Sequence, residues 1–124
     1  MTESTINPAM ATRWIEIPVS DFDRGKQFYE QVFQTDIEVI ELGDLRMGTF
    51  KDSSVAICHH PQFYFPAKEG MIVYFKAAED MEAMQNRVVA AGGEILIPWR
   101  VISPEQGSMA LFLDSEGNRV GVRS

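Results

Sequence analysis

A tryptophan and a glutamate two residues apart carry the first group of side chains suited to chemistry. Ile15, Ile17 and Val19 alternate with other residues, which predicts a strand with Trp14 and Glu16 together on its other face. A carboxylate in an apolar cavity can act as a general base, and an indole can stack on a planar ligand. We predict Glu16 as a catalytic residue and both residues as ligand-binding. The structural alternatives are a salt-bridged Glu16 and a Trp14 that only packs.

Both histidines and the single cysteine are neighbours, at Cys58, His59 and His60. Neighbours on a strand point to opposite faces, so the two histidines cannot bind one ion from a common face. The same geometry argues against a nucleophilic pair of Cys58 with either histidine. We predict that His59 contacts a ligand, although the spacing leaves open which histidine faces the cavity.

Arginines and methionines offer further ligand contacts. A guanidinium could bind a carboxylate or phosphate, and no spacing selects among Arg46, Arg100 and Arg123; we include Arg123 in the predicted site. Met47 and Met71 could give a pocket an adaptable lining. By contrast, residues 114–118 (DSEGN) have the composition of a turn, which explains them without a catalytic role.

Composition limits the class of protein. The 124 residues suit one domain with a real core, and the formal net charge of -7 argues against nucleic acid or an anionic membrane as a partner. A single cysteine excludes an intrachain disulfide, and the start MTESTINPA has neither a basic nor an apolar segment of a targeting signal. The longest apolar runs have the length of a strand, too short to span a membrane. We therefore expect a cytoplasmic protein.

The elements that position these residues occur in the same order twice. Residues 1–10 are predicted to be a flexible leader, and 61–70 a connector. In each half a strand is followed by a helix with a buried apolar stripe and then by three strands separated by turns. The first half has a strand over 13–19, a helix from 20 or 21 to about 34 and strands over 37–42, 46–50 and 55–59; the second has a strand over 71–75, a helix over 79–91 and strands over 94–97, 108–113 and 119–123.

This order predicts two βαβββ modules, 11–62 and 68–124, that form one domain over 11–124. A single module leaves one face of its sheet uncovered and is too small to be stable alone, which favours pairing of the two. The faces without helices are then free to curve around a ligand. By analogy with Trp14 in the first half, an offset near 57 residues assigns Met71, Val73 and Phe75 to that cavity face.

Four segments resemble one known family: WIEIPVSD, FYEQVF, AAGGEIL and LFLDSEGNRVGV. Together they look like the vicinal oxygen chelate superfamily of glyoxalase I, bleomycin-resistance proteins and extradiol dioxygenases, over residues 11–124. The W-x-E and D-x-x-G-N motifs are most similar to those of small bacterial proteins described as related to lactoylglutathione lyase. The resemblance implies an α+β fold in which paired, curved mixed sheets form an open cup with the helices on the outer face. It also implies a homodimer.

The resemblance further implies where a metal would be held. Enzymes of the family bind a divalent ion through four residues, typically His or Glu, on the first and last strands of each module. Those positions correspond here to Trp14, Ile57 or a neighbour, Met71 and Gly121. None of these side chains is a ligand for a hard metal, so we predict that the protein has no metal cofactor.

These observations favour a protein that binds or sequesters a small organic molecule in a metal-free cup. The alternative from another class is a lyase or isomerase like lactoylglutathione lyase, either metal-independent with Glu16 as base or using an atypical metal site at His59 or His60. A third possibility is a domain whose cup is filled by its own side chains and whose role is protein interaction.

Overall fold

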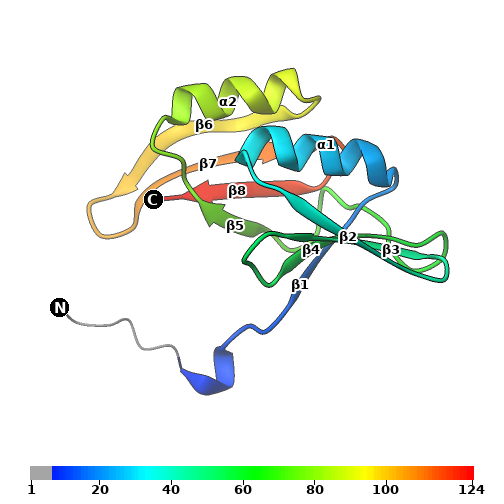
Figure 1. The fold of residues 1–124 in the computed structure, drawn as a ribbon. Coiled ribbons are helices and arrows are strands. Elements are labelled where there is room, and N and C mark those ends of the chain that lie inside the picture. The colour runs from blue at the N-terminus through cyan, green and yellow to red at the C-terminus, as the bar shows by residue number, and fades with distance from the viewer. Residues whose placement is uncertain (1–6) are drawn as a thin grey trace.

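The computed structural model of the protein describes residues 7–124. Most of the predicted leader, residues 1–6, lies outside the described residues. A short 3-10 turn, η1, spans Pro8–Met10, and residues 7–14 are all exposed. Figure 1 shows this N-terminal segment leading away from the body of the molecule.

Two modules of identical element order follow, each with one four-stranded sheet. In the first, β1 is parallel to β4 and the strand order is β1-β4-β3-β2; in the second, β5 is parallel to β8 and the order is β5-β8-β7-β6. The elements are β1 (Ile15–Pro18), α1 (Phe22–Phe33), β2 (Ile37–Leu42), β3 (Leu45–Phe50), β4 (Val55–His59), β5 (Val73–Lys76), α2 (Met81–Ala90), β6 (Glu94–Ser103), β7 (Gly107–Leu113) and β8 (Arg119–Arg123). The predicted repeat of two βαβββ modules is therefore confirmed.

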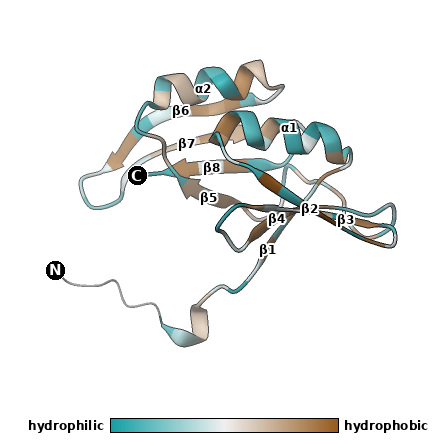
Figure 2. Cartoon of the chain, in the orientation of Figure 1, coloured by the Kyte–Doolittle hydropathy of each residue, from teal (hydrophilic) through white to brown (hydrophobic). Residues whose placement is uncertain are grey.

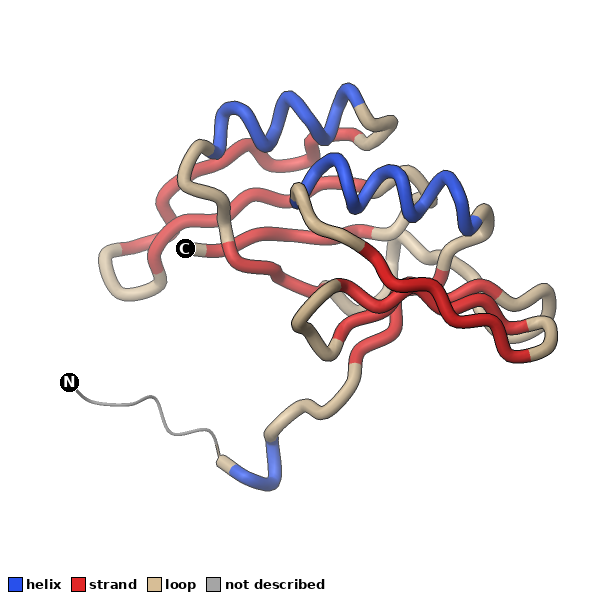
Figure 3. The backbone as a smooth tube through the Cα atoms, in the orientation of Figure 1, coloured by secondary structure: helices blue, strands red, loops and turns tan. Residues whose placement is uncertain are grey.

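Both helices lie on the same side of the strands, which leaves the opposite sheet faces open (Figures 1 and 3). Each helix begins at an aspartate whose side chain accepts a hydrogen bond from the backbone: Asp21 from Arg24 N and Asp80 from Ala83 N, both at 3.0 Å. The helix α1 ends where Gln34 takes a left-handed conformation with φ of 52°. These caps confirm the helix starts and stops expected from the sequence to within two residues.

One apolar core joins the two modules. In α1, Phe28 reaches Phe112 of β7 with ring centroids 6.2 Å apart, and Tyr29 reaches Phe75 of β5 at 6.5 Å. Figure 2 shows hydrophobic residues along the strands and a mixture of hydrophilic and hydrophobic residues on both helices. Because α1 contacts both sheets, burial of its apolar side fixes the second module against the first.

The first strand, expected over 13–19, spans Ile15–Pro18, and two strands of the second module also depart from the predicted bounds. The sixth strand, expected over 94–97, continues through Pro98 to Ser103, with irregular register against β7. Proline is tolerated there because β6 is an edge strand, where a missing backbone donor costs little. The fifth strand, expected over 71–75, spans Val73–Lys76, and Met71 before it is 97% exposed.

Candidate functional site

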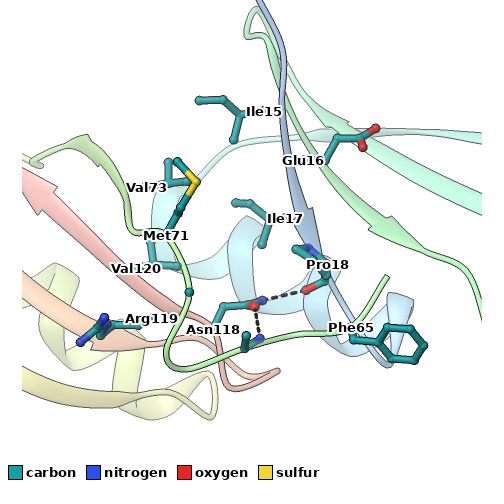
Figure 4. A pocket seen from close by; sticks show the side chains of 12 residues that line it. Ile15, Glu16, Ile17, Pro18, Phe65, Met71, Val73, Asn118, Arg119 and Val120 are labelled. Atoms are coloured by element: carbon teal, nitrogen blue, oxygen red, sulfur yellow. Dashed lines mark hydrogen bonds between the residues drawn. The ribbon is translucent and has the colours of Figure 1, made fainter. Parts of the chain in front are cut away.

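A cavity of about 360 Å³ lies where the edge strands of the two sheets approach each other. Its walls come from β1, from the start of β5 and β8, and from the connector before β5. Figure 4 shows Ile15 and Ile17 on one side and Met71, Val73 and Val120 facing them. The lining residues are Ile15, Glu16, Ile17, Pro18, Phe65, Ala67, Gly70, Met71, Val73, Asn118, Arg119 and Val120. The cavity is thus largely apolar, with few polar groups.

Asn118 closes one end of this cavity and connects three segments. Its Nδ2 donates to Pro18 O at 2.7 Å, and its Oδ1 accepts from Ala67 N at 3.1 Å (Figure 4). The same Nδ2 donates to Asp114 Oδ2 at 2.9 Å. Because all its partners are protein groups, Asn118 positions the cavity walls and is not free to bind a ligand through Nδ2.

The loop over residues 114–118 also clamps the first module through Glu116. Its buried carboxylate accepts from Asp21 N at 2.7 Å and from Arg24 Nε at 2.6 Å, with further donors from Ser20. Burial acts to raise the pKa of Glu116, but the hydrogen bonds from Arg24, Asp21, Ser115 and Ser20 outweigh it and lower the pKa to about 2. The loop is therefore more than a turn, because it holds the two modules together.

Asp114 is the buried centre of the same loop. Its carboxylate accepts from Tyr29 Oη at 2.6 Å and from Glu116 N and Asn118 N at 2.8 and 2.9 Å. Burial raises the pKa of Asp114 in spite of these donors, and burial together with the Asp114 charge raises the pKa of Tyr29. Through Tyr29, these hydrogen bonds fix the 114–118 loop to α1.

Glu16 is the centre of a second polar cluster, formed with Trp14, Cys58 and Tyr64. Tyr64 Oη donates to Glu16 Oε1 at 2.8 Å, and Trp14 Nε1 donates to Glu16 Oε2 at 3.1 Å. The hydrogen bond to Glu16 raises the pKa of Tyr64 to about 12. Burial, with the nearby Glu16 charge, raises the pKa of the Cys58 thiol to about 12, so this thiol is neutral at pH 7.

The structure brings several predicted site residues together around β1. Glu16 and Met71 line the cavity, and Trp14 contacts Glu16, as their shared face predicts. Met47 is on the same sheet face as Glu16, since it pairs with Cys58, which pairs with Pro18. In Figure 4, however, the Glu16 carboxylate is directed away from the side where Ile15 and Ile17 lie.

Three other predicted residues lie apart from this group. His59 pairs with Arg46, whose guanidinium is 4.3 Å from the Phe22 ring of α1, so it belongs to the helix-bearing face. Arg123 donates to Gln106 O at 2.7 Å in the turn before β7.

The third, Phe75, packs on α1, with its ring 4.9 Å from that of Phe33, and borders a smaller hollow of about 180 Å³. The repeat had assigned it to the cavity face. Val73, at the start of the same edge strand, does line the cavity. Val73 and Phe75 pair with the core residues Val120 and Val122, so both belong to the helix-bearing face of β5 and the assignment to the open face is wrong. The first strands of the modules begin 58 residues apart, at Ile15 and Val73, and an offset of one residue exchanges the two faces of a strand.

A comparison with protein families finds the description "Glyoxalase/Bleomycin resistance protein/Dioxygenase superfamily" matching residues 11–122. The chain belongs to this superfamily. The match covers both modules, from the segment before β1 to β8, and confirms the family that the sequence motifs indicate. None of the curated proteins compared matches the sequence significantly.

Solved structures of superfamily proteins share the fold at low sequence identity. A glyoxalase I mutant from Zea mays has 16% identity and a TM-score of 0.69; the match covers 90% of this chain and 45% of that chain. A glyoxalase family protein from Enterococcus faecalis has 19% identity and a TM-score of 0.67, with 93% and 98% covered. The fosfomycin resistance protein FosX from Mesorhizobium loti has 18% identity and a TM-score of 0.62, with 93% and 92% covered. This chain thus spans just under half of the maize protein and nearly all of the two bacterial ones.

The side chains present do not fit the metal site implied for superfamily enzymes. Ile57 is in the core and Gly121 lies under the Tyr74 ring. Trp14 and Met71 offer an indole and a thioether, neither of which is a ligand for a hard metal. Within residues 7–124 no group of three or more His, Cys, Asp or Glu side chains could hold a metal ion.

Among the polar residues of this site, sequence reasoning missed Tyr64, Asn118 and Arg119. Tyr64 is in the predicted connector and Asn118 in the predicted final turn, so the sequence assigned both residues to a loop and gave neither a role in the site. Arg119 directly follows that turn, but its place beside β1 depends on how the modules pair. The composition of DSEGN gives no signal of such a role, because the burial of Asp114 and Asn118, which exceeds what a surface turn requires, is visible only in the structure.

Proposed function

We propose that this superfamily member binds a small organic molecule with an apolar body in the cavity between β1 and β5, without a bound metal. The observation that carries the proposal is the lining of that cavity, in which apolar side chains from β1, β5 and β8 converge beside a few polar groups. Binding or sequestering a molecule needs no reactive group.

The size and composition of the cavity support this role. A volume of about 360 Å³ is within the range of ligand cavities, which are mostly apolar with a few placed polar groups. The segment between β4 and β5 contributes Phe65 and Met71, which are 66% and 97% exposed, so the opening is bordered by apolar side chains that are free to repack on a ligand.

The alternative of a metal-independent lyase or isomerase has less support. A general base needs a carboxylate within reach of the substrate proton, whereas Glu16 accepts hydrogen bonds from Tyr64 and Trp14 and is directed away from the apolar walls (Figure 4). The activities named for maize glyoxalase I and FosX belong to proteins with less than a fifth of their residues in common with this one, and a shared fold does not carry activity.

A substitution that fills the cavity tests the proposal. Ile15→Trp adds a large ring to one wall, and it should weaken binding of the neutral fluorescent probe N-phenylnaphthylamine at least about tenfold, because the ring occupies the volume of the ligand. Fluorescence titration measures the affinity, and thermal unfolding verifies that the variant is folded. Val101→Trp, at a 70% exposed position of β6, is the matched control and should bind like the wild type.

Equal affinity in the wild type and Ile15→Trp would exclude this cavity as the binding site.

The homodimer remains part of the proposal. Two large apolar side chains that line the cavity, Phe65 and Met71, are 66 and 97% exposed. Covering such a group against a second copy would remove apolar surface from water, which supports association.

A further inference from the structure

Among residues 7–124, two ionisable side chains line the cavity, Glu16 and Arg119, and they differ in their hydrogen bonding. Figure 4 shows them on opposite sides of the cavity, with their charged ends directed away from each other. Glu16 accepts two hydrogen bonds, from Tyr64 and Trp14. The Nε of Arg119 is buried and has no hydrogen-bond acceptor within the described part of the chain. A buried donor without an acceptor costs free energy, which a bound acceptor would recover.

The sheet face around Arg119 is also basic. Lys76 pairs with Arg123, and Arg119 is four residues before Arg123 on β8, so all three belong to the face away from α2. Arg100 pairs with Met109, which pairs with Arg123, and therefore shares this face. We call these four residues, Lys76, Arg100, Arg119 and Arg123, the basic face.

The basic face is not neutralised by the protein. The ion pairs between residues 7 and 124 use Arg24, Lys26 and Arg46, and none involves the basic face. Four of the 11 lysines and arginines thus gather on one sheet face of a chain whose net charge is -7. Glu94 shares this face, since it pairs with Leu113, which pairs with Arg119, but it forms none of these ion pairs. Such clustering produces a local positive potential that attracts anions from solution.

From these observations we infer that the ligand of the cavity is an organic anion. Its apolar body lies between Ile17 and Val73, and its acidic group, a carboxylate, sulfonate or phosphate, pairs with Arg119 on the basic side. The inference rests on the proposed function, because it names the chemical class that this cavity takes.

Two fluorescent probes with the same aromatic body test the inference on the full-length protein. Anilinonaphthalene sulfonate carries an acidic group and N-phenylnaphthylamine carries none. We expect Arg119→Gln to weaken binding of the sulfonate about tenfold, as loss of a charge-assisted contact does. Binding of the neutral probe should change less than about twofold, because the apolar walls are intact. Added salt should weaken only the sulfonate, since it screens charge.

Two further variants serve as controls. Lys51→Gln removes one positive charge at an exposed turn outside the cavity, and it should leave both affinities unchanged. Arg119→Lys retains the charge, and it should recover part of the sulfonate affinity that Arg119→Gln loses. Thermal unfolding of each variant verifies the fold.

The outcomes separate this inference from the proposed function. Equal effects of Arg119→Gln on both probes, or no effect on either, would overturn the anion class, while the cavity would stand if Ile15→Trp still weakens both. If Ile15→Trp leaves both affinities unchanged, the cavity itself is not the binding site, and the proposed function fails.

Discussion

At the scale of single residues, the acidic side chains of the candidate site are held by hydrogen-bond partners that lie far away in sequence. Trp14 and Glu16 do lie together, as their alternation predicts, but the partner that holds Glu16 on the other side is Tyr64 from the connector. Asp114 is similarly held by Tyr29, 85 residues away in sequence. Residue type alone indicated which groups are polar, whereas their partners determine what each can do.

Tyr29→Phe tests the buried hydrogen bond to Asp114. The change removes only the hydroxyl, so the Asp114 carboxylate loses a donor at 2.6 Å while the packing of the ring is retained. We expect the free energy of unfolding to fall by about 1–3 kcal/mol, the usual cost of leaving a buried polar group short of a partner.

Urea unfolding at pH 7 measures this change. The matched variant Tyr64→Phe removes a hydroxyl from an exposed hydrogen bond and should cost less than about 0.5 kcal/mol. Similar losses of unfolding free energy in both variants would show that burial does not make the Tyr29–Asp114 hydrogen bond more stabilising than the exposed one.

At the scale of elements, close packing between strands and α1 sets the shape of each module. Gly48 of β3 is buried where an added Cβ would lie 2.6 Å from Ile37 Cγ2 and 3.1 Å from the Phe22 ring. The absence of a side chain there lets α1 approach the first sheet. This approach positions β1, and with it one wall of the cavity.

Gly48→Ala should therefore destabilise the protein by about 1–3 kcal/mol through overpacking. Gly70→Ala is the matched control, because a Cβ there meets only Ala67 at an ordinary 3.7 Å. Chemical denaturation of the two variants compares them directly. A Gly48→Ala variant as stable as the wild type would show that Ile37 and Phe22 can move aside without cost.

At the scale of the whole molecule, the pairing of the modules depends on Glu116 as well as on the core. The folded protein lowers the pKa of this carboxyl from 4.5 to about 2, so folding stabilises its charged form. That contribution is fully present above about pH 4.5 and is lost as the pH falls towards 2.

Glu116→Gln removes this charge and tests the clamp. At pH 7 the variant should lose about 2 kcal/mol of unfolding free energy, a value reduced from the full pKa shift because Arg24 is partly exposed to solvent. Its stability should also decline less than that of the wild type between pH 4.5 and 2. Denaturant unfolding across this pH range gives both quantities.

Glu105→Gln, at an exposed turn, should behave like the wild type. Parallel pH curves for the wild type and Glu116→Gln would contradict a stabilising role for the charged clamp.

Assembly and location remain predictions. No helix in residues 7–124 is both long and apolar enough to cross a membrane. The cytoplasmic location, the homodimer and the absence of a metal cofactor are still expectations from the sequence and its resemblance.

The sequence by itself determined the order of the elements, the repeat of βαβββ modules and the superfamily, because alternation, helix caps and turn residues act between near neighbours. The tertiary structure decided which residues share the cavity. Asn118 reaches Pro18 across 100 positions and Glu116 reaches Ser20 across 96. Such contacts exist only when α1 buries its apolar side on both sheets at once, and no local pattern encodes that approach. For this reason Glu16 could be predicted from its strand, whereas Arg119 became a candidate only once the two edge strands lay beside each other.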